Sequence, residues 1–197
     1  MEELINIRIS EFQFSKRHEK IFEDTGFTLN KGEIVGVTGV NGTGKSTLLN
    51  LILGFIKSGN VNCRLNAEFS YLGDSVGFHP NLDYITHKEF FRNLVGEHYT
   101  PFEFFDLKQE YREKQYRHLS LGNKSKARIN LSLYQPYAVM DEPTEGLDAD
   151  SRLLFMEKIK KNVTSGLLVS HDADFINEVC THKVVLENHK ISEKIKL

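Results

Sequence analysis

The chain has 197 residues, of which 40% are hydrophobic and 26% charged, and its formal net charge is -2. That length allows one full-sized hydrophobic core, and the composition is ordinary for a globular domain. The slightly negative charge excludes a strongly basic surface, so we expect no nucleic acid as a partner. Two cysteines, Cys63 and Cys180, exclude a disulfide framework and fit a reducing compartment.

The beginning of the chain is acidic and lacks the apolar segment of a signal peptide. Its uninterrupted apolar runs are only a few residues long, so the sequence predicts no segment that spans a bilayer. If this protein works at a membrane, another chain must supply the span.

The first third of the chain predicts strands at residues 4–14, 22–29 and 34–37. The last of these is a short, apolar, β-branched run, which is typical of a strand buried on both faces. A glycine-rich turn follows. Residues 46–53 then predict a helix that ends before Gly54.

The middle of the chain, residues 82–118, is rich in aromatic side chains. A threonine with a glutamate three residues later forms a capping box at residues 86–89 and again at residues 100–103. In the second box Pro101 occupies the position that proline favours at a helix start. We therefore predict a small helical lobe inserted into an α/β domain.

Strands and helices are predicted to alternate again in the last third of the chain. The expected elements are strands at residues 137–140 and 167–169, helices at residues 150–163 and 172–180, and a closing hairpin of residues 184–186 and 190–192 across Asn188 and His189. Such alternation favours a mainly parallel sheet covered by helices.

The strongest motif is GVNGTGKS at residues 39–46, which fits G-x-x-x-x-G-K-[ST] between a predicted strand and a predicted helix. Glycines let backbone N–H groups approach phosphate oxygens, and the opening helix adds the positive end of its dipole. We expect Lys45 to reach the β- and γ-phosphates and the Ser46 hydroxyl to ligate Mg²⁺. The predicted nucleotide-binding residues here are Gly39, Asn41, Gly42, Thr43, Gly44, Lys45, Ser46 and Thr47. The alternative is a glycine-rich turn that binds nothing. That alternative does not explain why Lys45 and Ser46 occupy the last two positions of the motif.

A second candidate site is the apolar strand of residues 137–140, which runs into two adjacent acids. Buried strands rarely end in paired carboxylates unless a cation lies nearby. Asp141 suits the shell of Mg²⁺, and Glu142 could polarise an attacking water as a general base. Without the Lys45 motif, a solvated acidic loop would be the better interpretation.

These motifs together resemble the ABC ATPase family. The stretch DEPTEGLD at residues 141–148 is similar to the family's Walker B and D-loop, LSLGN at residues 119–123 to its signature, and LVSHD at residues 168–172 to its switch-histidine segment. The resemblance covers nearly the whole chain, in the expected order. It implies a P-loop NTPase fold with a mainly parallel core sheet, an N-terminal antiparallel β part and a short inserted helical lobe. The chain is then one domain over residues 1–197, with residues 82–118 as the inserted subdomain.

The resemblance also implies that one subunit holds an incomplete site. Two subunits would pack head to tail around ATP and Mg²⁺, as a homodimer or a heterodimer. Ser120 and the Gly122 N–H would bind the γ-phosphate held by the partner, at a helix start that favours anions. His171 would contact the γ-phosphate in its own subunit, and Asp148 would couple the two sites. Taken alone, Ser120 could be only a helix N-cap and His171 an ordinary exposed histidine.

Several residues depart from the family pattern. In the signature, Leu121 replaces a glycine and Asn123 a glutamine. Asp74 stands where the family has a glutamine or glutamate near Mg²⁺, and its side chain is one methylene shorter. The adenine-stacking aromatic is expected at Phe14, with His18 as the other candidate; Phe14 could equally belong to the core.

The expected function is ATP binding and hydrolysis that powers transport by a separate membrane-spanning subunit. The chain would be cytoplasmic and peripheral on the inner face of the cell membrane. Leu121 and residues 77–82 are similar to exporter branches, so we favour export. Two alternatives stay open: a soluble ABC ATPase that does not serve transport, and a weakly hydrolysing regulatory half of a heterodimeric pair.

Overall fold

The computed structural model describes residues 2–73 and 76–197. Its central sheet has the strand order β10-β8-β3-β7-β6-β5, with β9 paired to β8. The strands of this sheet are β3 (Ile34–Thr38), β5 (Ser70–Leu72), β6 (Tyr137–Asp141), β7 (Ser165–Val169), β8 (His182–Glu187), β9 (Lys190–Ile191) and β10 (Ile195–Lys196). Strands β8, β3, β7, β6 and β5 run parallel, whereas β9 and β10 are antiparallel to β8. The predicted α/β class with a mainly parallel sheet is confirmed.

A smaller antiparallel sheet precedes it in the chain and has the order β2-β1-β4. Its strands are β1 (Glu3–Phe12), β2 (Phe22–Asn30) and β4 (Val61–Leu65). Alternate residues of β1 are buried, including Ile5, Ile7 and Ile9, because only one face of this sheet meets the core. The predicted N-terminal antiparallel part is therefore confirmed.

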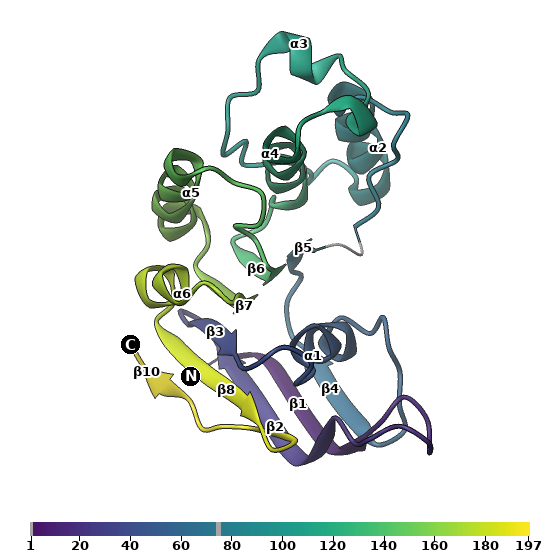
Figure 1. The fold of residues 1–197 in the computed structure, drawn as a ribbon, viewed down its shortest axis with the longest axis vertical. Coiled ribbons are helices and arrows are strands. Elements are labelled where there is room, and N and C mark those ends of the chain that lie inside the picture. The colour runs from purple at the N-terminus through teal and green to yellow at the C-terminus, as the bar shows by residue number, and fades with distance from the viewer. Residues whose placement is uncertain (1, 74–75) are drawn as a thin grey trace.

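Two apolar cores cover the two faces of the parallel sheet. Helix α1 (Lys45–Ile52) packs into the first core, which joins the antiparallel sheet to one face of the parallel strands. Helices α5 (Ala149–Asn162) and α6 (Ala173–Val179) supply the second core on the other face. Figure 1 shows the resulting layers, with α5 and α6 on the left of the view and α1 beside β4 on the right.

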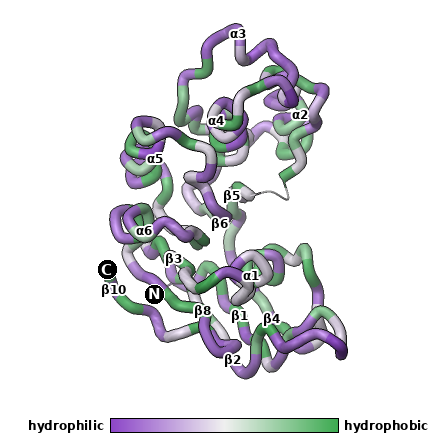
Figure 2. Tube along the Cα trace, in the orientation of Figure 1, coloured by the Kyte–Doolittle hydropathy of each residue, from purple (hydrophilic) through white to green (hydrophobic). Residues whose placement is uncertain are grey.

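The segment between β5 and β6 forms the upper part of the molecule in Figure 1. It contains α2 (Tyr84–Val95), α3 (Gln109–Arg112), the 3-10 turn η1 (Tyr116–His118) and α4 (Leu121–Ser132). Helix α3 buries no residue, and Figure 2 shows mostly hydrophilic residues there. Among the described residues, no helix of the chain is both long and apolar enough to cross a membrane.

Both predicted helix starts in this segment are wrong. Helix α2 begins at Tyr84, two residues before the first capping box, because the Asp83 carboxylate accepts a hydrogen bond from Thr86 N at 2.7 Å and caps the helix. The second box, at residues 100–103, starts no helix. Instead, Asn130 on α4 pairs with both the N–H and the carbonyl of Phe105, each at 2.8 Å. This pairing and the burial of Phe104 hold the segment in an irregular conformation.

The predicted closing hairpin is present as β8 and β9. Its turn residues, Asn188 and His189, have φ values of 49° and 63°. Positive φ at both central positions is the pattern of a tight two-residue hairpin turn, and asparagine tolerates it better than most residues. The helix over residues 46–53 is also present within one residue, and Gly54 follows it with φ 73°.

Candidate functional site

Three loops that carry predicted site residues leave the same edge of the parallel sheet. Strands β3, β7 and β6 are adjacent, and Asp141 at the end of β6 lies opposite Val169 at the end of β7. The phosphate loop follows β3, Glu142 follows β6, and His171 follows β7. Because ligands of open parallel sheets bind outside the carboxyl ends of the strands, this edge is the expected site.

The phosphate loop has the conformation that its glycines permit. Gly39, Gly42 and Gly44 have φ values of 149°, 87° and 99°, which side chains with a Cβ rarely adopt. A Cβ at Gly39 would lie 2.7 Å from Leu186 O, and one at Gly44 would lie 2.4 Å from Ile21 Cγ2. The loop is therefore a cradle that has no room for a side chain at Gly39 or Gly44.

Lys45 lies inside this cradle. Its side chain is buried, and its ammonium donates hydrogen bonds to Gly39 O at 2.9 Å and Val40 O at 3.1 Å. An ammonium held at the first residue of α1 adds its charge to the positive end of the helix. Ser46 beside it is exposed and Thr47 is half-buried. This arrangement fits phosphate oxygens, as the sequence predicts.

Glu142 has a strained backbone and a well-bonded side chain. Its φ is 45°, a left-handed value that is rare for a residue with a long side chain. Its Oε2 accepts hydrogen bonds from Ser170 Oγ at 3.2 Å, His171 N at 3.2 Å and His171 Nδ1 at 2.9 Å. Glu142 is about a quarter exposed, whereas His171 is largely exposed. The structure thus brings these two predicted residues into direct contact.

Asp141 ends β6 and is half-buried next to the same edge. Within residues 2–73 and 76–197, no group of three or more histidine, cysteine and acidic residues could hold a metal ion. Mg²⁺ does not need such a cage, since it binds one or two protein oxygens together with water and substrate phosphates. Asp141 and Ser46 therefore fit Mg²⁺ as a companion of bound nucleotide. Asp74, the third predicted ligand, lies outside the described residues.

The signature residues lie at the start of α4. Ser120 is the N-cap of this helix, and its hydroxyl accepts from Asn123 N at 3.3 Å. The side chain of Leu121 is 67% exposed. Gly122 lies under the D-loop, since a Cβ there would be 3.3 Å from Gly146 O. Ser120 is therefore a helix N-cap, which was one of the two interpretations of this residue. Because Ser120 is exposed, its hydroxyl also remains accessible.

The D-loop lies against α4 and ends at a capped helix. Asp148 caps α5 by accepting from Ser151 N at 2.8 Å, and Lys126 Nζ lies 3.5 Å from its carboxylate. Hydrogen bonds from the Ser151 side chain and from its backbone N–H, assisted by the charge of Lys126, lower the pKa of Asp148 to about 2.

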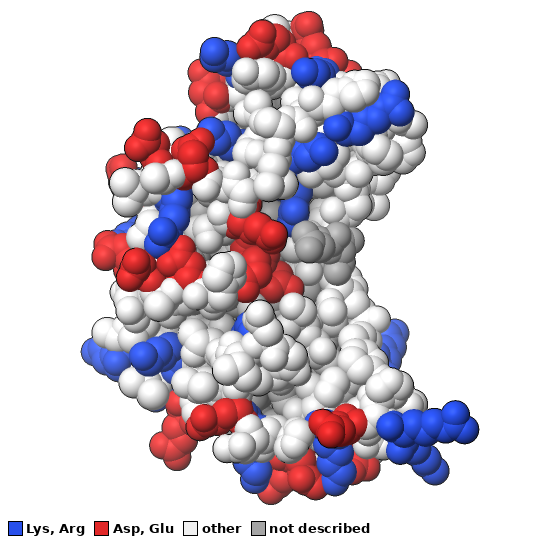
Figure 3. Space-filling view, in the orientation of Figure 1, with Lys and Arg blue, Asp and Glu red and all other residues white. Residues whose placement is uncertain are grey.

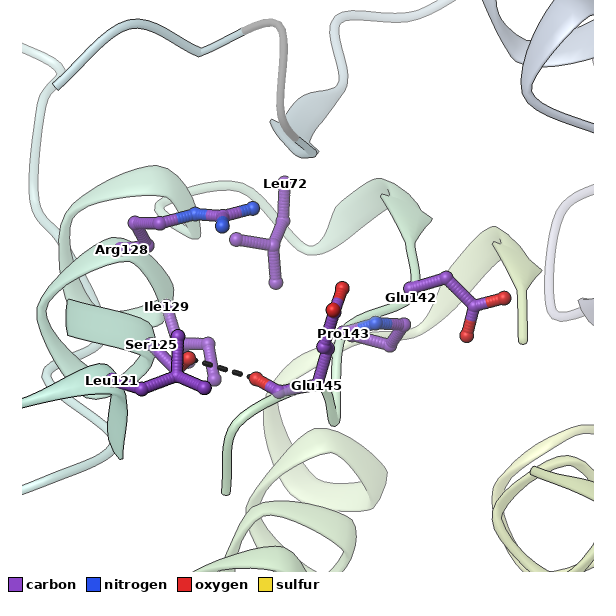
Figure 4. Close-up of a pocket in the computed structure, with 8 residues that line it drawn as sticks. All are labelled: Leu72, Leu121, Ser125, Arg128, Ile129, Glu142, Pro143 and Glu145. Carbon is purple, nitrogen blue, oxygen red and sulfur yellow. Dashed lines mark hydrogen bonds between the residues drawn. The ribbon is translucent and has the colours of Figure 1, made fainter. Parts of the chain in front are cut away.

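A cavity of about 220 Å³ separates α4 from the loop after β6. In Figure 4 the Ser125 hydroxyl donates to Glu145 O at 2.8 Å, and Arg128 extends across the cavity beside Leu72. The carboxylate of Glu142 points away from these residues. Figure 3 shows acidic atoms gathered at mid-height of this face of the molecule.

Phe14, the predicted adenine-stacking residue, lies in the connection between β1 and β2. It is 59% exposed and packs edge-on against Phe12 at a centroid distance of 5.4 Å. This exposure leaves much of the side chain accessible, as stacking requires. His18, the other candidate, is also exposed and hydrogen-bonds Ser15 Oγ through Nδ1 at 2.6 Å.

Sequence reasoning missed three residues around Glu142. Ser170 bonds its carboxylate directly, while Arg152 Nη2 donates to Asp172 Oδ1 at 2.7 Å two residues further along the same loop. Ser170 and Asp172 flank the histidine in its motif, but no pattern in the sequence links them to Arg152.

The fold and this edge define an α/β protein of the P-loop nucleotide-binding class. The family model "ABC transporter" matches residues 22–145, which is more than half of the chain. The chain therefore belongs to the ABC transporter family, as an ATP-binding subunit and ATP hydrolase.

Individual relatives are similar over most of the chain. AlbC of Bacillus subtilis, named an ABC transporter ATP-binding protein, is 30% identical over 92% of this chain and 87% of its own length. CcmA of Chelativorans sp., named a cytochrome c biogenesis ATP-binding export protein, is 31% identical over 77% and 82%. The ribosome protection protein VmlR of Bacillus subtilis is 30% identical over 89% of this chain but only 33% of its own length.

Solved structures share the fold. A dimeric bacterial ABC transporter cassette superposes with a TM-score of 0.82 at 16% identity, covering 98% of both chains. At that identity the likeness concerns the fold alone.

Proposed function

We propose that this chain hydrolyses ATP with Mg²⁺ as one of two ATPase subunits that close head to tail and drive a separate membrane-spanning subunit. Residues 1–197 act as a single ATPase domain in this proposal, with residues 82–118 as the inserted helical subdomain. The second ATPase subunit is another copy of this chain or a related one.

The observation that carries the proposal is the separation of two motifs within one subunit. The phosphate loop precedes α1 in the lower half of Figure 1, whereas the signature opens α4 in the upper half. Ser120 is exposed at a helix N-terminus, where anions are stabilised. A γ-phosphate on Lys45 therefore meets Ser120 and the Gly122 N–H only if they come from a second subunit.

The proposed chemistry assigns each residue one task. Lys45 and the loop N–H groups hold the phosphates, while Ser46 and Asp141 hold Mg²⁺, which neutralises phosphate charge when bound. Oε1 of Glu142 takes a proton from water as the new O–P bond forms and the bond to the leaving ADP breaks. His171 positions the water and the γ-phosphate.

The test is the mass of purified Glu142→Gln protein in solution, with and without ATP and Mg²⁺, by light scattering on a sizing column. We expect a shift from monomer to dimer with ATP, because this variant binds nucleotide but hydrolyses it slowly. Lys45→Ala in the same assay should stay monomeric. A monomer that binds ATP would contradict self-pairing and favour an obligate partner chain.

The proposal extends to export, from the cytoplasmic side of the cell membrane. Leu121 in the signature supports this direction, and so does the similarity to CcmA, which is named an export protein. Once the membrane chain is identified, ATP-dependent cargo uptake by inside-out vesicles, and not by right-side-out vesicles, would be the expected result.

A non-transport role is the second candidate, since VmlR is named a ribosome protection protein. The chain matches one third of VmlR, which leaves most of that protein without a counterpart here. Transport is favoured because AlbC and CcmA match this chain over most of their own length. Co-sedimentation with ribosomes in the presence of ATP would favour the second candidate.

A further inference from the structure

The loop between β7 and α6 contains a buried serine whose hydroxyl both donates and accepts a hydrogen bond. Ser170 is 2% exposed, and its Oγ donates to Glu142 Oε2 at 3.2 Å and accepts from Asp172 N at 3.1 Å. A buried hydroxyl is tolerated only where its hydrogen bonds are made. Here those bonds join the switch-histidine loop to the carboxylate.

Three donors converge on one oxygen of Glu142. The donors are Ser170 Oγ, His171 N and His171 Nδ1. All three bonds end on Oε2 and not on Oε1. Hydrogen bonds to one carboxylate oxygen fix the plane of the group and leave the other oxygen in a set direction. The φ of Glu142 is 45°, a strained backbone value that persists only where surrounding contacts hold the residue in place.

The contacts continue beyond Ser170 to the helix that follows the D-loop. Asp172 caps α6 through Phe175 N at 3.0 Å and accepts from Arg152 Nη2 at 2.7 Å. Arg152 lies in the first turn of α5, and its own N–H donates to Asp148 O at 2.9 Å. An unbroken series of hydrogen bonds therefore connects the D-loop cap to Glu142.

We propose that Ser170 is a positioning residue for ATP hydrolysis: its hydroxyl holds Oε2 of Glu142 so that Oε1 faces the attacking water, and the Arg152–Asp172 pair holds Ser170 in place. The inference rests on the proposed role of Glu142 as general base. It assigns a kinetic role to the residue that directly precedes His171 in the chain.

The test compares two replacements that are isosteric with each other: Ser170→Thr, which keeps the hydroxyl, and Ser170→Val, which removes it. Hydrolysis of ATP with Mg²⁺ is followed at protein concentrations above that of ATP, so that slow variants remain measurable. Ser132→Ala is the matched control, because Ser132 is also buried and its hydroxyl has no hydrogen-bond partner among the described residues. Melting temperature and ATP affinity are measured for every variant.

We expect Ser170→Val to slow hydrolysis about tenfold, the size of one hydrogen bond to a charged group, with ATP affinity changed less than about twofold. Ser170→Thr and Ser132→Ala should hydrolyse at close to the wild-type rate. In a Glu142→Gln background, Ser170→Val should cause no further loss, because its effect acts through the carboxylate.

Two outcomes would overturn the proposal. Equal rates for Ser170→Val and Ser170→Thr would show that the hydroxyl has no kinetic role. If Ser170→Val slows hydrolysis by the same factor in the Glu142→Gln background as in the wild-type background, Ser170 acts independently of Glu142. Wild-type hydrolysis by Glu142→Gln itself would instead remove the proposed general base, which is a different and separately visible failure.

Discussion

The phosphate loop and the Glu142 cluster lie at the same edge of the sheet but are built in opposite ways. The loop is one continuous stretch in which Lys45 bonds the carbonyls of Gly39 and Val40. The cluster joins Glu142 to Ser170 and residues near it, nearly thirty positions away in the chain. The first site follows from local conformation, whereas the second exists only because β6 and β7 are neighbours in register.

This difference teaches where each site is sensitive. A continuous loop depends on backbone geometry, so its glycines and its lysine carry its function. An assembled cluster depends on the contacts that hold its parts together, so residues that never touch substrate influence it.

Lys45→Ala should have the largest effect. Loss of the buried ammonium should slow ATP hydrolysis roughly 10²–10³-fold, as for other preorganised charges at a phosphate, and weaken ATP binding. The measurements are hydrolysis kinetics and ATP titration. Lys31→Ala is the control, since Lys31 is an exposed lysine paired with Glu2. An unchanged rate for Lys45→Ala would contradict the phosphate-loop assignment.

Gly44→Ala should destabilise the fold by about 2–4 kcal/mol, because the new Cβ meets Ile21 in addition to the strain at φ 99°. Gly42→Ala has a similar φ of 87° and nothing within 4 Å of its Cβ, so about 1–2 kcal/mol is expected. Urea unfolding of both variants measures the difference. The Ile21→Ala change should partly restore Gly44→Ala; the absence of any rescue would argue against the steric cause.

Arg152→Ala should slow hydrolysis about threefold and leave ATP affinity unchanged. A threefold change corresponds to a free energy within the range that a partly exposed ion pair contributes. The reason is that Arg152 holds the loop of Ser170 without touching Glu142. Arg112→Ala is the control, because Arg112 pairs with Asp106 in the α3 region. If the two variants hydrolyse ATP equally fast, the series of contacts from α5 does not reach the site.

The pH dependence of stability should show the smallest effect. The pKa of Asp148 is lowered to about 2 by its capping bonds, so the ionised carboxylate stabilises the folded state above the ordinary aspartate pKa of about 4. This contribution is lost as pH falls from about 4 toward 2. Asp148→Asn keeps a capping oxygen but does not titrate. The difference in melting temperature between wild type and Asp148→Asn should therefore shrink below pH 4, and a constant difference would contradict the assignment.

Much of the fold followed from local patterns. The buried run of β3 and the hairpin turn at Asn188 were predicted close to their observed positions, because each is encoded in a few adjacent residues. Strands β4 and β5 were not predicted, since β4 is largely exposed and β5 is only three residues long. The second helix of the inserted segment was predicted wrongly, because the Asn130 pairing with Phe105 overrides a good local capping signal.

The sequence by itself determined the phosphate cradle, the order of the motifs and the family. These depend on glycine conformation and on side chains spaced within one loop or one strand end. Only the tertiary structure decided that Glu142 meets Ser170 and His171, and that Arg152 supports them through Asp172. The physical reason is that these contacts cross between strands and helices, so their geometry is set by sheet register and helix packing rather than by spacing along the chain.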